Sequence, residues 1–147
     1  MKTLENMSFY DKLVYAFREI LLYHHDSLEF RAKMYTVPIL ANPDGGDCEM
    51  EKVSQMAKEI YPKSRNRRNA LLLTIKEYID KAVEPNGLGI DELIFDLEKD
   101  LKRKSRFSHK IHIEHIEKLI ECTTEENSKI YQSRILSLFT KLKKSFS

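Results

Sequence analysis

Residues 113–139, IEHIEKLIECTTEENSKIYQSRILSLF, decide the class of fold more clearly than any other stretch of the sequence. On both sides of a short polar segment, isoleucine and leucine recur every three or four residues, which is the spacing of one face of an α-helix. Thr123 and Glu126 have the spacing of a capping box, so we expect Thr123 to begin the second helix. The stretch therefore predicts two amphipathic helices joined by a short loop.

The same helical spacing extends over the rest of the chain, which has 147 residues. Glycine and proline are scarce, with four of each, and no segment alternates between apolar and polar residues as a half-buried strand would. We therefore predict an all-α protein, a single domain over residues 1–147 that forms a compact bundle of about seven helices. The other helices are expected to begin near Ser8, Ser27, Asp47, Arg67, Ile90 and Phe107, with Pro38 kinking or shortening the second.

Two parts of the chain, residues 28–61 and 109–142, follow the same order of helix, short polar loop and helix. In the first part, four residues mark the end of one helix and the opening of the next: Ala41, Asp44, Gly45 and Glu51. This layout resembles the tellurite-resistance TerB-like helical domains. Their hallmark is an apolar helix that ends in Ala-Asp-Gly and is followed by a Glu that opens the next helix, at the spacing of Asp44 and Glu51.

The chain departs from the TerB-like pattern in both parts. Asn42 and Pro43 separate Ala41 from Asp44, and Thr123-Thr124 stands where the family has a second Asp-Gly. The resemblance implies two pseudo-symmetric helical halves without catalytic residues, a role in tellurite and general stress resistance, and an acidic loop that has been proposed to bind metal ions. One branch of the family is fused to J-domain co-chaperones, so the resemblance also implies a protein partner.

The acidic loop itself is the first candidate site. Clustered carboxylates are ligands for hard divalent cations, but Gln55 stands where an EF-hand loop beginning at Asp44 would have its bidentate glutamate. The sequence therefore predicts at most a weakly bound divalent cation. The alternative is that the acids only cap the next helix and complement its dipole. The four candidate ligands are Asp44, Asp47, Glu49 and Glu51.

Histidine and cysteine offer a second kind of metal ligand. His109, His112 and His115 recur every three residues and would share one helix face, so a helical metalloprotein that binds a transition metal is an alternative function. A polar helix face that happens to be rich in histidine is the simpler interpretation. Cys48 and Cys122 are far apart in the sequence and are expected to be reduced thiols.

Basic residues suggest a third function, that of an accessory protein that binds nucleic acid. Such clusters can contact phosphates, although the overall charge is balanced, with 25 Lys and Arg against 23 Asp and Glu. A solvated charged surface is the competing interpretation, because short charge runs usually have that role. The candidate contacts are Lys63, Arg65, Arg67, Arg68, Lys102, Arg103, Lys104 and Arg106.

The first residues and the apolar runs of the chain indicate in which compartment of the cell the protein is expected. The first residues, MKTLENMSFYDKL, lack the apolar core of a signal peptide, and no apolar run approaches the roughly 18 residues of a membrane span. Together with the expected thiols, this predicts a cytoplasmic protein without a membrane partner. The leading hypothesis is a non-enzymatic, TerB-like helical module with a stress-related role that binds a protein partner or, weakly, a divalent cation.

Overall fold

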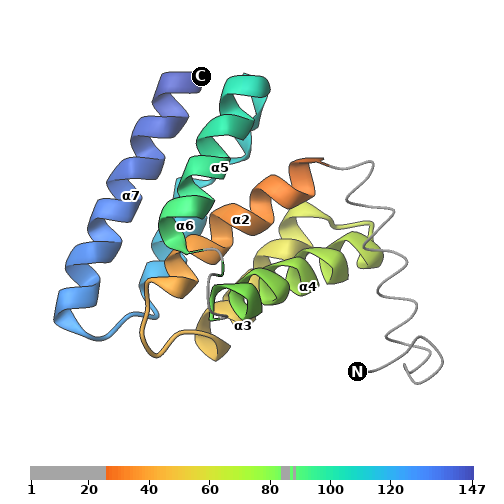
Figure 1. Ribbon diagram of the computed structural model, residues 1–147. Helices are drawn as coiled ribbons and strands as arrows, with labels where there is room; N and C mark the ends of the chain where they lie inside the picture. The colour runs from red at the N-terminus through yellow and green to blue at the C-terminus, as the bar shows by residue number, and fades with distance from the viewer. Residues whose placement is uncertain (1–25, 84–86, 88) are drawn as a thin grey trace.

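The computed structural model describes residues 26–83, 87 and 89–147, and within these residues the chain forms six α-helices and one 3₁₀ helix and no strand. The predicted all-α fold is thus confirmed, while the helix expected near Ser8 lies outside the described residues. Figure 1 shows the arrangement. The helices are α2 (Asp26–Leu40), α3 (Asp47–Ile60), α4 (Arg65–Ala82), α5 (Ile90–Arg103), the 3₁₀ helix η2 (Ser105–Lys110), α6 (Ile113–Ile120) and α7 (Glu126–Phe146).

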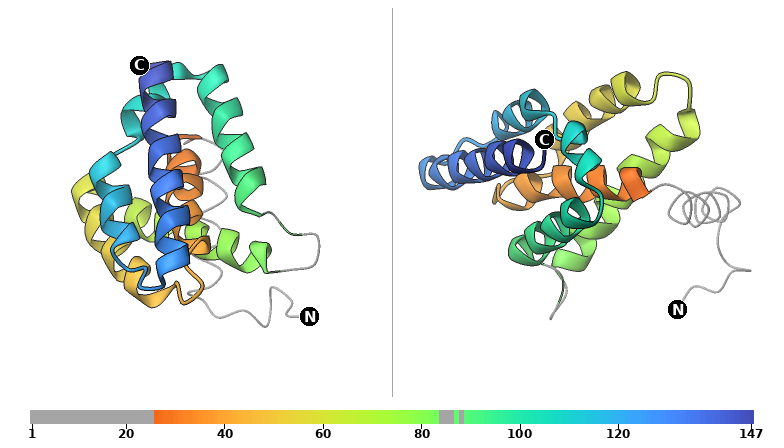
Figure 2. Two further views of the ribbon diagram at one scale, coloured as in Figure 1. Left: turned by 90° about the vertical axis from the view of Figure 1, so that its left-hand side faces the viewer. Right: turned by 90° about the horizontal axis from the view of Figure 1, so that it is seen from above.

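Helix α2 lies at the centre of the bundle. It contacts α4, α5, α6, α7 and η2, and the view from above in Figure 2 shows it running between the other helices. Nine of its 15 residues are buried, because a helix that is covered from several sides needs apolar residues around most of its circumference. The remaining helices bury one stripe each, as Leu93, Leu97 and Leu101 do on α5.

Pro38 lies inside α2, close to its end. The helix continues through Pro38 to Leu40, although Pro38 has no N–H to donate to the carbonyl of Met34 four residues earlier. The last four carbonyl groups of an α-helix have no N–H partner within the helix, and the carbonyl of Pro38 is one of them. Gln132 of α7 donates from Nε2 to this oxygen over 2.8 Å, so α7 supplies the missing hydrogen bond.

The predicted helix from Phe107 onward is wrong at its start. Residues 105–110 form η2, and α6 begins only at Ile113, after His112 as its N-cap. Phe107 packs against Phe30 of α2, with ring centroids 5.3 Å apart, and Ile111 is fully buried in an extended conformation. The break lets both side chains reach the core, which residue spacing alone did not indicate.

The predicted N-cap of α7 is also wrong. Glu125, not Thr123, is the N-cap of α7, and its carboxylate accepts from the backbone N–H groups of Asn127 and Ser128 at 3.0 and 2.7 Å. Thr123 is buried instead, and its hydroxyl accepts from Gln132 Nε2 at 3.0 Å. The hydroxyl of Thr123 is thus used by a buried amide and makes no bond to the first turn of α7.

Candidate functional site

The two loops that the sequence placed in equivalent positions lie side by side. Cys48, in the first turn of α3, forms a disulfide with Cys122, and the two Cα atoms are 5.9 Å apart. Asn42 Nδ2 donates to the carbonyl oxygen of Cys122 over 3.4 Å. Figures 1 and 2 show both loops at the same end of the bundle. We call residues 41–49 and 121–123 the loop junction.

The disulfide corrects the expectation of two reduced thiols. The cysteines are 74 positions apart in the sequence, so only the tertiary fold shows that they are neighbours. Their Cα separation lies within the usual range for disulfides, about 4.4–6.8 Å. The disulfide also removes the cysteines as an argument for a reducing compartment.

Glu49 is the central side chain of the loop junction. It is fully buried, and its two carboxylate oxygens accept hydrogen bonds from the backbone N–H of Gly46 at 3.1 Å and from Asn42 Nδ2 at 2.9 Å. Gly46 is the N-cap of α3, so Glu49 and not Asp47 satisfies this end of the helix. Gly46 has a φ of 145°, which favours glycine, and a Cβ on Gly45 would lie 2.6 Å from the carbonyl oxygen of Ile39.

The four predicted cation ligands do not all point to one place. Asp44, Asp47 and Glu51 are exposed, whereas Glu49 is buried beneath the loop. Within the described part of the chain, one group of potential metal ligands has atoms close enough to share an ion. It consists of Cys48, Glu49 and Cys122, whose ligand atoms all lie within 4.8 Å of one another. Of the predicted acids, only Glu49 belongs to it.

The three histidines are divided among different elements. His109 is exposed on η2, His112 is half-buried at the N-cap of α6, and the rings of His112 and His115 have centroids 4.8 Å apart. His115 is buried and bridges the core to the surface. Its Nδ1 lies 2.8 Å from the hydroxyl of Tyr35, and its Nε2 lies 3.3 Å from a carboxylate oxygen of Glu59. These contacts favour the interpretation of His115 as a satisfied core residue.

Burial also changes the acid–base properties of this cluster. It raises the pKa of the fully buried Tyr35 hydroxyl above its usual value, so the phenol stays protonated and available as a donor. Burial is also the main cause that lowers the pKa of His112, with a smaller contribution from the neighbouring His115. His112 is therefore neutral near pH 7, and its ring carries no charge toward His115.

Several residues of the predicted nucleic-acid surface make contacts within the protein. Arg68 donates from one guanidinium nitrogen to the carbonyl oxygens of Tyr61 and Pro62, and so it closes the turn between α3 and α4. Lys104 and Arg103 both form ion pairs with Asp26, at 2.7 and 3.4 Å. The hydrogen bond from Lys104 is the main reason that the pKa of Asp26 is lowered. These contacts favour a structural role for the three basic side chains.

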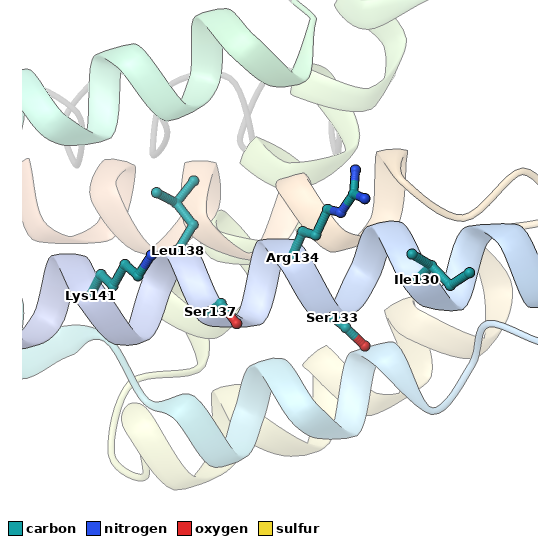
Figure 3. A pocket seen from close by; sticks show the side chains of 6 residues that line it. All are labelled: Ile130, Ser133, Arg134, Ser137, Leu138 and Lys141. Atoms are coloured by element: carbon teal, nitrogen blue, oxygen red, sulfur yellow. The ribbon is translucent and has the colours of Figure 1, made fainter.

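A shallow groove lies along the outer face of α7, as shown in Figure 3. Its volume is about 470 Å³. Ile130 is 57% exposed, and Figure 3 shows it on the same side of the helix as Arg134 and Leu138. Sequence analysis did not single out this face, because its apolar residues look like an ordinary core stripe. The groove is lined by Ile130, Ser133, Arg134, Ser137, Leu138 and Lys141.

Comparisons of the chain with protein-family models, curated proteins and solved structures find no significant match. Among the described helices, none is both long and apolar enough to cross a membrane.

Proposed function

We propose that this chain is a non-enzymatic, TerB-like helical module that binds a protein partner through the groove on α7. The observation that carries the proposal is the groove itself, in which the exposed Ile130 and the half-buried Leu138 lie about two turns apart on one side of α7, while the opposite face of the helix is packed in the core. Apolar side chains that are gathered on a surface and bordered by polar ones mark interaction sites. The groove follows α7 for about three turns, a length suited to a helix of another protein.

The charges along the groove define the chemistry of the partner. Arg134 and Lys141 border it, and neither of them forms an ion pair with another residue in the described part of the chain. Two exposed cations beside an apolar strip are complementary to an amphipathic helix with acidic residues along its edges. We therefore propose an acidic amphipathic helix as the segment of the partner that binds.

The adjacent loops support the TerB-like part of the proposal. Pseudo-symmetric halves should bring their two loops together, and the disulfide and the bond from Asn42 to Cys122 join them. A role in stress resistance follows from the resemblance alone. For the location, we propose the cytoplasm, where a disulfide usually forms only transiently and in response to the redox state.

The test uses two synthetic helical peptides with the same leucine pattern, one flanked by glutamates and the other by lysines. Amide chemical shifts of the full chain should change along α7 with the acidic peptide, and the affinity should fall as salt increases. Ile130→Ser combined with Leu138→Ser should weaken binding by about tenfold or more, as loss of apolar anchors does. Val83→Ser is the matched control, because Val83 is 79% exposed at the end of α4.

Equal binding of the acidic and the basic peptide would contradict the assigned chemistry. Shift changes that avoid α7, or an equal loss of affinity in the Val83→Ser variant, would contradict the assigned surface.

A further inference from the structure

The loop junction contains a buried carboxylate without a positive partner. Glu49 is fully buried and accepts hydrogen bonds from two neutral donors, the backbone N–H of Gly46 and the side-chain amide of Asn42. In the described part of the chain, no Lys, Arg or His forms an ion pair with it. Buried charges in proteins are usually paired or coordinate metals, so the environment of Glu49 is suited to a cation.

Two sulfur atoms complete a set of three ligands around this carboxylate. The Sγ atoms of Cys48 and Cys122 and an oxygen of Glu49 all lie within 4.8 Å of one another. Two thiolates on one tetrahedral zinc ion are roughly 3.8 Å apart, given Zn–S bonds of about 2.3 Å. Side-chain rotations can supply that separation once the disulfide is reduced, while the Cα atoms stay near their present 5.9 Å.

We propose that Cys48, Glu49 and Cys122 bind a thiophilic divalent transition metal such as Zn²⁺ when the disulfide is reduced, and that the disulfide is the metal-free form. Two thiolates and one carboxylate leave the fourth tetrahedral position for water, which can enter because Cys48 is exposed. The donors to Glu49 have the role of the outer hydrogen bonds that orient ligating carboxylates. Cys48 and Glu49 also lie in the first turn of α3, where the helix dipole stabilises negative ligands.

The chemistry of the change between the two forms balances. A dithiol reductant transfers two electrons and two protons to the disulfide, which yields the two thiols and leaves the reductant as its own disulfide. Zn²⁺ then displaces one proton from each thiol. Hydrogen peroxide reverses the change: the two thiolates give up two electrons and form the S–S bond, the peroxide takes two protons and becomes two waters, and Zn²⁺ is released.

The test uses the full chain, reduced with a phosphine that carries no thiol, and Co²⁺ as a spectroscopic substitute for Zn²⁺. The reduced protein should bind one Co²⁺ per chain with thiolate-to-metal absorption, and Zn²⁺ should displace it. Peroxide should release the metal as the disulfide forms, which a chromophoric chelator measures. The oxidised protein should show no such absorption.

Three variants separate the proposed ligands from the surrounding acids. Cys122→Ser should lose the thiolate absorption of the pair, and Glu49→Gln should weaken binding by more than about tenfold, the lower limit for even an outer-shell partner. Glu51→Gln is the matched control, because it neutralises an exposed acid two residues away and should keep the affinity. Circular dichroism checks that each variant folds, and disulfide formation in Glu49→Gln shows that its loops still meet.

Four results would overturn the proposal. One is a reduced chain that binds no metal, and another is metal bound equally by the oxidised protein, which would place the ion at the exposed acids Asp44, Asp47 and Glu51. The others are full binding by a folded Glu49→Gln variant, and equal losses in Glu49→Gln and Glu51→Gln. None of these results bears on peptide binding at α7, so this proposal can fail separately from the proposed function.

Discussion

Removal of the disulfide by Cys48→Ser with Cys122→Ser should destabilise the protein mainly through its unfolded state. The cross-link joins positions 74 residues apart, and the chain entropy of closing a loop of that length corresponds to roughly 4 kcal/mol at 25 °C. The side chain of Gln132, which ties α7 to Pro38 and Thr123, involves neither sulfur. The folded loop junction should therefore persist, and we expect the free energy of unfolding to fall by about 2–4 kcal/mol.

Urea unfolding followed by circular dichroism measures this loss. Three samples are compared in the presence of a metal chelator: the oxidised parent, the parent reduced by a phosphine, and the double serine variant. The reduced parent and the variant should agree, and both should have a larger dependence on urea than the oxidised protein, because their unfolded chains expose more surface. A loss below about 1 kcal/mol in both would refute the chain-entropy reasoning. A loss in the variant alone would show that serine disturbs the folded loops.

Three further predictions concern single side chains and are measured by denaturation. Tyr35→Phe should cost about 1–3 kcal/mol, because it leaves the buried Nδ1 of His115 without a partner, and a variant as stable as the parent would contradict that bond. The pKa of Asp26 is lowered by its bond from Lys104, so its contribution to stability should be present above the ordinary value of 3.8 and be lost as the pH falls through the lowered one. Asp26→Asn should remove that part of the acid dependence, and an unchanged pH profile would exclude it. Glu125→Ala should lower the unfolding midpoint by removing the cap of α7.

The sequence predicted best those helices that have one buried face. The stripe Leu93, Leu97 and Leu101 is buried on α5 as its spacing required, since that helix meets the core from one side. Helix α2 has no single apolar stripe, because the core surrounds it. In the sequence, only its apolar content and Pro38 indicated the extent of this helix. The 3₁₀ helix η2 was missed, because its residue types also fit an α-helix and only the packing of Phe107 requires the break.

The candidate sites were harder to predict than the helices. The Cys48–Cys122 pair depends on how the two loops meet, and the sequence contains no local signal for a contact over 74 positions. Glu49 looked like one of four equivalent acids, yet it alone is buried, because its position in the first turn of α3 lets it reach back to Gly46. The exposure of Ile130 could not be distinguished from a core position, since both kinds of residue recur at the same helical spacing.

Gln132 lies between the proposed metal site and the groove on α7, and its contacts determine whether a change at one can alter the other. It is fully buried, and its amide donates to Pro38 of α2 and to Thr123, the residue after Cys122. Breaking these bonds would leave buried polar groups unpaired, which costs about 1–3 kcal/mol each, so α7 is held in place while the loop junction changes its chemistry. The exchange of a disulfide for a metal ion needs only a new separation of two sulfur atoms, which side-chain rotation supplies. The groove on the outer face of α7 should therefore keep its shape in both redox forms.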